Sequence, residues 1–267
     1  MPDEPDDSTA EDQFRAEAAS RDLPADEAEE WIRVALPAVY IGGDGGDEDG
    51  RDGPPVARLG GDPMLPREAP DPPSPFVASI DCAALPPEGT GLPLPSEGHL
   101  LLFADPGDRR QGAAPGAVVY VPARTATAAR PVGDRAPFVE KRTRRWYRRL
   151  EPQSHESFAV DRWGLVPEDE HFELAEELDD VWREVYGLPP GWDLQIGGHP
   201  IVLQNDPVHW ARESDAGAAT EDWALLATWR CGDDVTELDG GVIHWVIRRG
   251  DLAALRFDRV HRYTDMA

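Results

Sequence analysis

The residues best suited to bind a ligand lie in one short stretch of the second half of the chain. His199, Gln204 and Asp206 flank an apolar run, residues 201–203 (IVL), which we expect to be a strand. Imidazole, amide and carboxylate groups at the ends of a rigid strand could form the polar wall of a pocket. The same groups could instead cap the turn after the run by hydrogen bonds to the backbone. The sequence is compatible with both interpretations.

His244 and Trp229 are two further candidate binding residues. His244 stands between Ile243 and Trp245 in a strand-like run, so strand alternation turns its ring to the face opposite theirs. An ordinary surface histidine, or one held by a hydrogen bond, would show the same pattern. Trp229 ends the apolar run 223–229, where a core position is the alternative to a platform for a ligand.

The chain lacks the short motifs that mark common catalytic and cofactor sites. It contains no G-x-S-x-G, no phosphate-binding glycine loop and no H-E-x-x-H. The aspartates of residues 42–53 lack the spacing of a calcium-binding EF-hand loop. Cys82 and Cys231 have no C-x-x-C spacing and are expected to be buried thiols. We therefore predict no catalytic residues, no metal and no cofactor.

Charge is the most unusual bulk property of the chain. It has 52 acidic and 26 basic residues, which gives a formal net charge of −26. Such a surface repels nucleic acids and anionic membranes and attracts basic proteins. A basic cluster with aromatic neighbours, residues 141–149, resembles a single-stranded nucleic-acid site, but in so acidic a chain it favours pairing with the protein's own carboxylates. The predicted partner is a basic protein, with no nucleic acid and no membrane.

The sequence also gives an expectation about the cellular compartment. The first residues lack the basic and apolar regions of a secretion signal, and no apolar run approaches the roughly 20 residues of a membrane span. We expect a cytoplasmic protein. The sequence leaves its oligomeric state open.

Two parts of the chain resemble each other. Residues 59–63 (LGGDP) match residues 196–200 (IGGHP), and each segment precedes an apolar run that ends near Cys82 or Cys231. Each half then reaches a glycine, Gly98 or Gly241, that opens another apolar run. Three matches in the same order indicate a degenerate duplication. The predicted fold is strand-rich α+β, with two β-rich repeats packed together and a few helices.

The predicted domain organisation follows from composition and periodicity. Residues 1–25, acidic and bearing prolines, are expected to form a disordered tail, of which residues 1–22 can be removed without loss of stability. Residues 26–267 are expected to form a single domain, with repeat halves at about 55–125 and 190–260. An apolar stripe between Pro167 and Gly187 predicts the longest helix. A shorter helix is expected from Asp26 to the helix-breaking Pro37.

Several short motifs, in a fixed order, resemble those of the YwqG-like family of uncharacterised bacterial proteins. The resemblance covers about residues 30–265. It departs at Ser79 and Thr228, where the family usually has Gln, so a site that these Gln residues line would be altered here. The resemblance implies an α+β fold with duplicated β-rich halves and supplies no activity. The motifs are residues 59–66 (LGGDPMLP), 80–86 (IDCAALP), 94–100 (LPSEGHL), 197–200 (GGHP) with Gln204 and Asp206, 223–226 (WALL), and Asp251-Leu252 with Phe257.

These observations favour a non-enzymatic, acidic protein-interaction or binding protein, for which the resemblance permits an immunity-like role. The alternative is an enzyme or small-ligand sensor with its site between the two repeat halves, since pockets often form at such seams. If the fold contains a pocket, we expect it at the seam, with His199, Gln204 and Asp206 on its wall.

Overall fold

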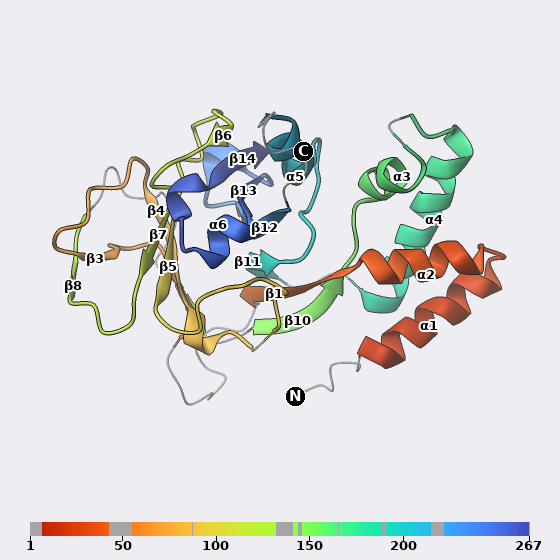
Figure 1. Cartoon of the computed structure of the whole chain (residues 1–267), viewed down its shortest axis with the longest axis horizontal. Helices are drawn as coiled ribbons and strands as arrows, with labels where there is room; N and C mark the ends of the chain where they lie inside the picture. The colour runs from red at the N-terminus through yellow and green to blue at the C-terminus, as the bar shows by residue number, and fades with distance from the viewer. Residues whose placement is uncertain are drawn as a thin grey trace.

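The computed structural model describes residues 7–42, 55–86, 88–131, 141–143, 146–164, 166–187, 191–214 and 222–266. Within them the chain forms helices and antiparallel sheets, which confirms the predicted α+β class. Figure 1 shows the sheets on one side of the molecule and helices α1–α4 on the other. The helices are α1 (Asp7–Ser20), α2 (Ala25–Val34), α3 (His155–Trp163), α4 (Asp169–Tyr186), α5 (Pro207–Ser214) and α6 (Arg249–Ala253).

The larger sheet has seven strands in the order β10-β1-β11-β12-β13-β14-β6, and the smaller has five in the order β7-β5-β4-β2-β9. Strands β3 and β8 form a separate two-stranded ribbon. The strands are β1 (Leu36–Gly42), β2 (Ala57–Leu59), β3 (Met64–Pro66), β4 (Phe76–Asp81), β5 (His99–Phe103), β6 (Gly112–Ala113), β7 (Val118–Val121), β8 (Thr127–Ala129), β9 (Lys141–Thr143), β10 (Trp146–Glu151), β11 (Trp192–Gly197), β12 (Trp223–Arg230), β13 (Val242–Arg248) and β14 (His261–Asp265).

The main core lies between the two sheets. Ile80 and Leu100 of the smaller sheet belong to the same buried cluster as Ile196, Trp229 and Trp245 of the larger one. The indole Nε1 of Trp245 donates a hydrogen bond to the carbonyl of Phe103 at 3.4 Å, which joins the sheets directly. Each sheet therefore has an inner face in this shared core and an outer face turned away from it.

Helices α1–α4 build a second core, and α1 overturns the predicted disorder of residues 1–25. Phe14 and Ala18 of α1 are buried, and the ring of Phe14 lies edge-on to Trp182 at 5.2 Å. Ala10, Phe14 and Ala18 are spaced four residues apart, so they form one apolar stripe on an otherwise acidic helix. The prediction of disorder rested on the acidic composition of the segment and did not take this stripe into account. Residues 1–6 lie outside the described part of the chain.

Most of the other predicted elements agree with the structure. The longest predicted helix is α4, and α2 ends before Pro37, as expected. The apolar runs of the second half form β12 and β13. Residues 201–203 are an exception, because they form an irregular loop and not a strand. No helix in the described segments is long and apolar enough to cross a membrane.

The two Gly-Gly segments occupy corresponding positions in the two sheets. Gly60 and Gly61 follow β2 with φ of 67° and 72°, and Gly197 and Gly198 at the end of β11 have φ of 70° and 71°. These left-handed conformations favour glycine. Strands β7-β5-β4-β2-β9 correspond in order to β14-β13-β12-β11-β1. Whether both halves derive from one duplicated unit stays a prediction.

Two further hydrogen-bond patterns match between the sheets. The amide of Cys82 donates to the carbonyl of Gly98 at 3.0 Å, and the amide of Cys231 donates to the carbonyl of Gly241 at 2.9 Å. Arg58 donates to the carbonyls of Gly60 and Asp62 at 3.1 and 2.6 Å. Gln195 donates to the carbonyls of Gly197 and His199 at 2.9 and 2.7 Å. In each sheet one side chain thus holds the turn that follows its own strand.

Candidate functional site

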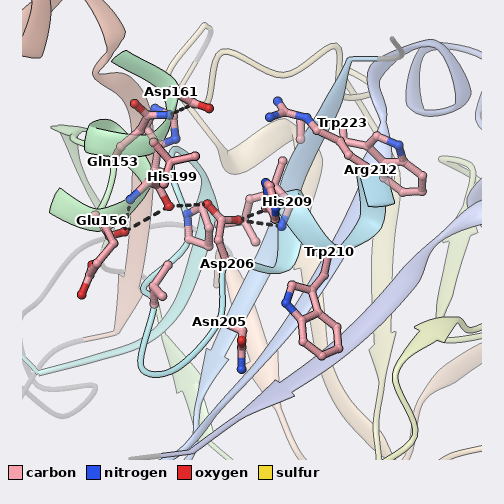
Figure 2. A pocket seen from close by; sticks show the side chains of 18 of the residues that line it. Gln153, Glu156, Asp161, His199, Asn205, Asp206, His209, Trp210, Arg212 and Trp223 are labelled. Atoms are coloured by element: carbon pink, nitrogen blue, oxygen red, sulfur yellow. Dashed lines mark hydrogen bonds between the residues drawn. The ribbon is translucent and has the colours of Figure 1, made fainter. Parts of the chain in front are cut away.

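A cavity of about 430 Å³ lies between α3, α5 and the loop 198–206. Its volume is within the range of small-molecule and side-chain binding pockets. His199, Gln204 and Asp206 all line it, so the structure brings three of the five candidate residues together. Figure 2 shows Asp206 in the middle, between Gln153, Glu156 and Asp161 on one side and Trp210 and Arg212 on the other.

Asp206 is held in place by hydrogen bonds at both of its carboxylate oxygens. Oδ1 accepts from the amides of Val208 and His209 at 2.8 and 3.1 Å, as expected of the residue that caps the N-terminus of α5. Oδ2 accepts from the hydroxyl of Ser157 on α3 at 2.8 Å. Asp206 therefore fixes the distance between α3 and α5, in line with the capping interpretation.

His199 is also held by a hydrogen bond to the protein's own backbone. Its Nε2 lies 2.8 Å from the carbonyl oxygen of Val34, to which the ring donates. Burial lowers the pKa of His199, so the ring is neutral near pH 7. Gln204 differs from both, because its side chain is exposed at the cavity rim.

The loop that carries Gln204 is held from the last strand. Oδ2 of Asp265 accepts hydrogen bonds from the amides of Leu203, Gln204 and Asn205 at 2.8, 2.9 and 3.4 Å. A carboxylate that accepts several backbone N–H groups replaces the missing strand pairing of this loop. The amides of residues 203–205 therefore need no sheet partner. Asp265 is thus a positioning residue of the site that sequence reasoning missed.

His244 and Trp229 lie outside this cavity. Trp229 is buried in the core between the sheets. His244 is fully buried on the outer face of the larger sheet, where its Nδ1 shares a hydrogen bond of 2.9 Å with the hydroxyl of Thr228. Burial lowers the pKa of His244 to about 4. The predicted rotation away from Ile243 and Trp245 is correct, and the ring is held by a hydrogen bond.

The sequence predicted a pocket at the seam between the two halves, but the cavity lies elsewhere. Its described lining comes from Leu36, residues 153–161, residues 198–212, residues 222–225 and Arg249, with no residue from the first half at 55–125. Apolar side chains of both sheets fill the space between the halves. The helical unit supplies the second wall, and no local signal in the sequence of α3 indicates that it faces residues 198–206.

The described side chains give little support to nucleophilic or metal chemistry at this site. No group of three or more His, Cys, Asp or Glu among the described residues is arranged to hold a metal ion. Burial raises the pKa of the thiols of Cys82 and Cys231 to about 12, so neither is a thiolate near neutral pH. The described cavity wall combines carboxylates, imidazoles, indoles and arginines with amide, hydroxyl and aliphatic side chains, which suits recognition of a ligand that has both a charged and an apolar part.

Comparison with known proteins agrees with the architecture. Residues 57–265 match a family described as a domain of unknown function, DUF1963. The chain belongs to the DUF1963 family. No curated protein matches it. The narrower YwqG-like assignment stays a prediction.

The DUF1963 match begins after β1, yet β1 is an internal strand of the larger sheet. It pairs with β10 on one side, with Tyr40 opposite Tyr147, and with β11 on the other, with Tyr40 opposite Gln195. In this DUF1963 protein, residues outside the matched range therefore complete a sheet whose other strands lie within it.

Proposed function

We propose that this DUF1963 protein is a non-enzymatic binding protein whose cavity between α3 and α5 receives a basic segment of a protein partner. The observation that carries this proposal is the combination of exposed carboxylates and exposed apolar groups around one cavity. Glu156 and Asp161 lie on the α3 side, and Leu203 and Trp210 lie on the loop and on α5. Leu203 and Trp210 are 37% and 39% exposed, so two large apolar side chains are accessible at one cavity.

The charges of the cavity complement an arginine or lysine side chain. The described partner of Asp161 is the neutral amide of Gln153, at 2.7 Å, so its negative charge is not balanced by that contact. Two arginines, Arg212 and Arg249, line the cavity against four carboxylates, and Arg249 pairs with one of these, Asp222, at 3.1 Å. The net charge of −26 adds a long-range field that draws a basic partner toward the surface.

Trp210 supplies the apolar part of the proposed recognition. Tryptophan is enriched among the residues that dominate protein–protein binding energy. An arginine stem packed on its indole would combine burial of apolar surface with a cation–π contact. A partly rigid wall favours this, because Asp265 and Asp206 hold backbone amides in the segment that leads up to Trp210. An immunity-like role would be one form of such binding, with a basic toxin as the partner.

The test uses a short capped peptide that contains two arginines and a matched peptide with two glutamates. Binding is followed by tryptophan fluorescence, since Trp210 and Trp223 line the cavity, and by calorimetry. We expect the arginine peptide to bind, the glutamate peptide not to bind, and the affinity to fall as salt is raised.

The variant that probes the site is E156Q/D161N, which removes two negative charges from the cavity. We expect about tenfold weaker binding of the arginine peptide. The control is E173Q/E176Q, an equal charge change at exposed positions of α4 outside the cavity. Equal weakening by both pairs would show that only the general acidity of the protein matters, and the cavity would lose its proposed role.

A further inference from the structure

A second cavity, of about 550 Å³, lies on the outer face of the smaller sheet. Its described lining includes three arginines, Arg58, Arg124 and Arg142. We propose that this cavity is a binding site for a small molecule that carries an oxyanion, either a phosphate or a carboxylate group. Arginine binds both groups through parallel N–H···O bonds.

The sheet places two of these arginines side by side. Arg58 of β2 lies directly opposite Arg142 of β9, and on its other side opposite Ser79 of β4. Directly opposed residues point to the same face of a sheet, and like charges in such a pair are unfavourable unless an anion lies near them. An oxyanion bound on this face would add a favourable charge for both arginines and could also accept a hydrogen bond from the Ser79 hydroxyl.

The turn after β2 does not require the positive charge of Arg58. The guanidinium holds the turn after β2 by bonds to the carbonyls of Gly60 and Asp62 at 3.1 and 2.6 Å. Gln195 makes the corresponding two bonds in the larger sheet with a neutral amide, at 2.9 and 2.7 Å. A neutral amide is therefore enough to hold such a turn, so the positive charge of Arg58 is not needed for these two bonds.

The loop between β7 and β8 completes the cavity with Arg124, Thr125 and Thr127. Arg124 has a φ of 63°, a left-handed conformation that is uncommon for residues other than glycine, asparagine and aspartate. Unusual backbone at a ligand-facing position is a frequent feature of binding sites.

The acidic residues of the described lining do not cancel these charges. Asp81 and Glu97 line the cavity as well, against three arginines. Oδ1 of Asp81 accepts from the amide of Ala83 at 3.0 Å, as the cap of a short 3-10 helix. Arg58 and Arg142 keep further contacts within the chain, so a bound oxyanion would add to these contacts. In a chain of net charge −26, a concave face with more arginines than carboxylates is an exception.

The experiment is calorimetric titration of the full chain at low ionic strength, with inorganic phosphate in one arm and succinate in the other. The arm that binds more tightly identifies which oxyanion the site prefers. The decisive variant is Arg58→Gln, because Gln195 shows that glutamine can hold this kind of turn. We expect Arg58→Gln to weaken binding by about tenfold or more while the thermal unfolding midpoint stays nearly unchanged.

The control is Arg67→Gln, at an exposed position outside the described lining, which should bind as tightly as the natural chain. If Arg58→Gln does not fold, Arg124→Gln provides the same test at an exposed position of the cavity. Absence of binding in both arms, or equal affinity in Arg58→Gln, Arg124→Gln and the natural chain, would overturn the assignment. Neither result bears on the arginine peptide, whose proposed cavity is lined by other residues.

Discussion

The outer faces of the two sheets share a frame of corresponding strands and differ in what covers them. On the larger sheet a row of five directly paired residues is buried, and residues of the loop 198–206 and of α5 lie over that face. On the smaller sheet four of the five residues of the corresponding row, all except Val119, line a cavity. The first row is Tyr40, Gln195, Thr228, His244 and Tyr263, and the second is Arg142, Arg58, Ser79, Leu101 and Val119.

The difference arises from what the chain does after each Gly-Gly turn. After Gly198 the chain is held by Asp265 and capped by Asp206, and it leads into α5. After Gly61 it enters β3, which pairs with β8 in a separate ribbon. Val121 stands where the larger sheet has Asp265, since Val121 pairs with His99 and Asp265 with Val242. One carboxylate at the end of a strand thus helps to decide whether the face is closed by the protein itself.

The largest effect is expected from Gly198→Ala. This substitution changes the turn that leads from β11 into the loop over the outer face of the larger sheet. A Cβ at Gly198 would lie 2.6 Å from the Cβ of Ala38, and the residue has a φ of 71°. Backbone strain and overpacking together should lower the free energy of unfolding by about 3 kcal/mol, measured by urea titration. Gly187→Ala is the control, because its φ is 68° and no atom lies within 4 Å of the added Cβ. Equal losses in the two variants would mean that Gly198 is needed only for its backbone conformation.

Asp265→Ala should remove the carboxylate that holds the loop over the outer face of the larger sheet. The smaller sheet has Val121 at the corresponding position. Three backbone amides of residues 203–205 lose their acceptor, and we expect a loss of about 2 kcal/mol of unfolding free energy. Hydrogen exchange of the same amides should accelerate. Asp258→Ala, at an exposed position with a 3.8 Å contact to Arg259, should change stability by less than about 0.5 kcal/mol. Unchanged exchange in Asp265→Ala would contradict the proposed role of this carboxylate.

His244 makes the larger sheet sensitive to pH, whereas Leu101 at the corresponding position does not titrate. The pKa of His244 is about 4 in the fold and 6.5 as its ordinary value. Between these values the unfolded chain binds the additional proton, so stability falls as the pH is lowered through this window. From pH 7 to pH 5 this contribution is about 2 kcal/mol.

The measurement for His244 compares urea unfolding of the natural chain and of His244→Gln at pH 7 and pH 5. Asp206 and Asp265 act on His244 electrostatically and are present in both proteins, so their effects largely cancel in the difference. The variant should lose less stability on acidification than the natural chain. An identical pH dependence would show that His244 is not the group that titrates.

Asp206→Ala is expected to have the smallest effect. Loss of the α5 cap should cost about 1 kcal/mol of unfolding free energy. Gln204→Ala, at an exposed position of the same loop, should cost less than about 0.5 kcal/mol. If Asp206→Ala abolished binding of the arginine peptide at unchanged stability, Asp206 would be a contact residue and not a cap.

Local patterns in the sequence were sufficient for much of the fold. The apolar stripe of α4, the runs of β12 and β13 and the two Gly-Gly turns are properties of neighbouring residues, and the structure contains all of them. The sequence also indicated His199, Gln204 and Asp206, which share one cavity. Composition misled at α1, where three apolar residues spaced four apart outweigh many acidic ones.

The remaining features depend on contacts between residues distant in sequence. Asp265 lies about sixty residues from the loop amides that it holds, so no window of the sequence reveals the contact. Ser157 of α3 bonds to Asp206 across 49 residues. The placement of the cavity beside the helices, and not at the seam, follows from such contacts.

The internal position of β1 has a consequence for how the chain folds during synthesis. β1 is complete at Gly42, but its partners β10 and β11 begin only at Trp146 and Trp192. At translation rates of about 5–20 residues per second, β1 would wait on the order of 10 s for β11 to be synthesised. Both edges of this apolar strand are unpaired until β10 is made, and one edge stays unpaired until β11 is made; such an edge is prone to association with other chains. The nascent protein should therefore depend on chaperones more than its modest size suggests.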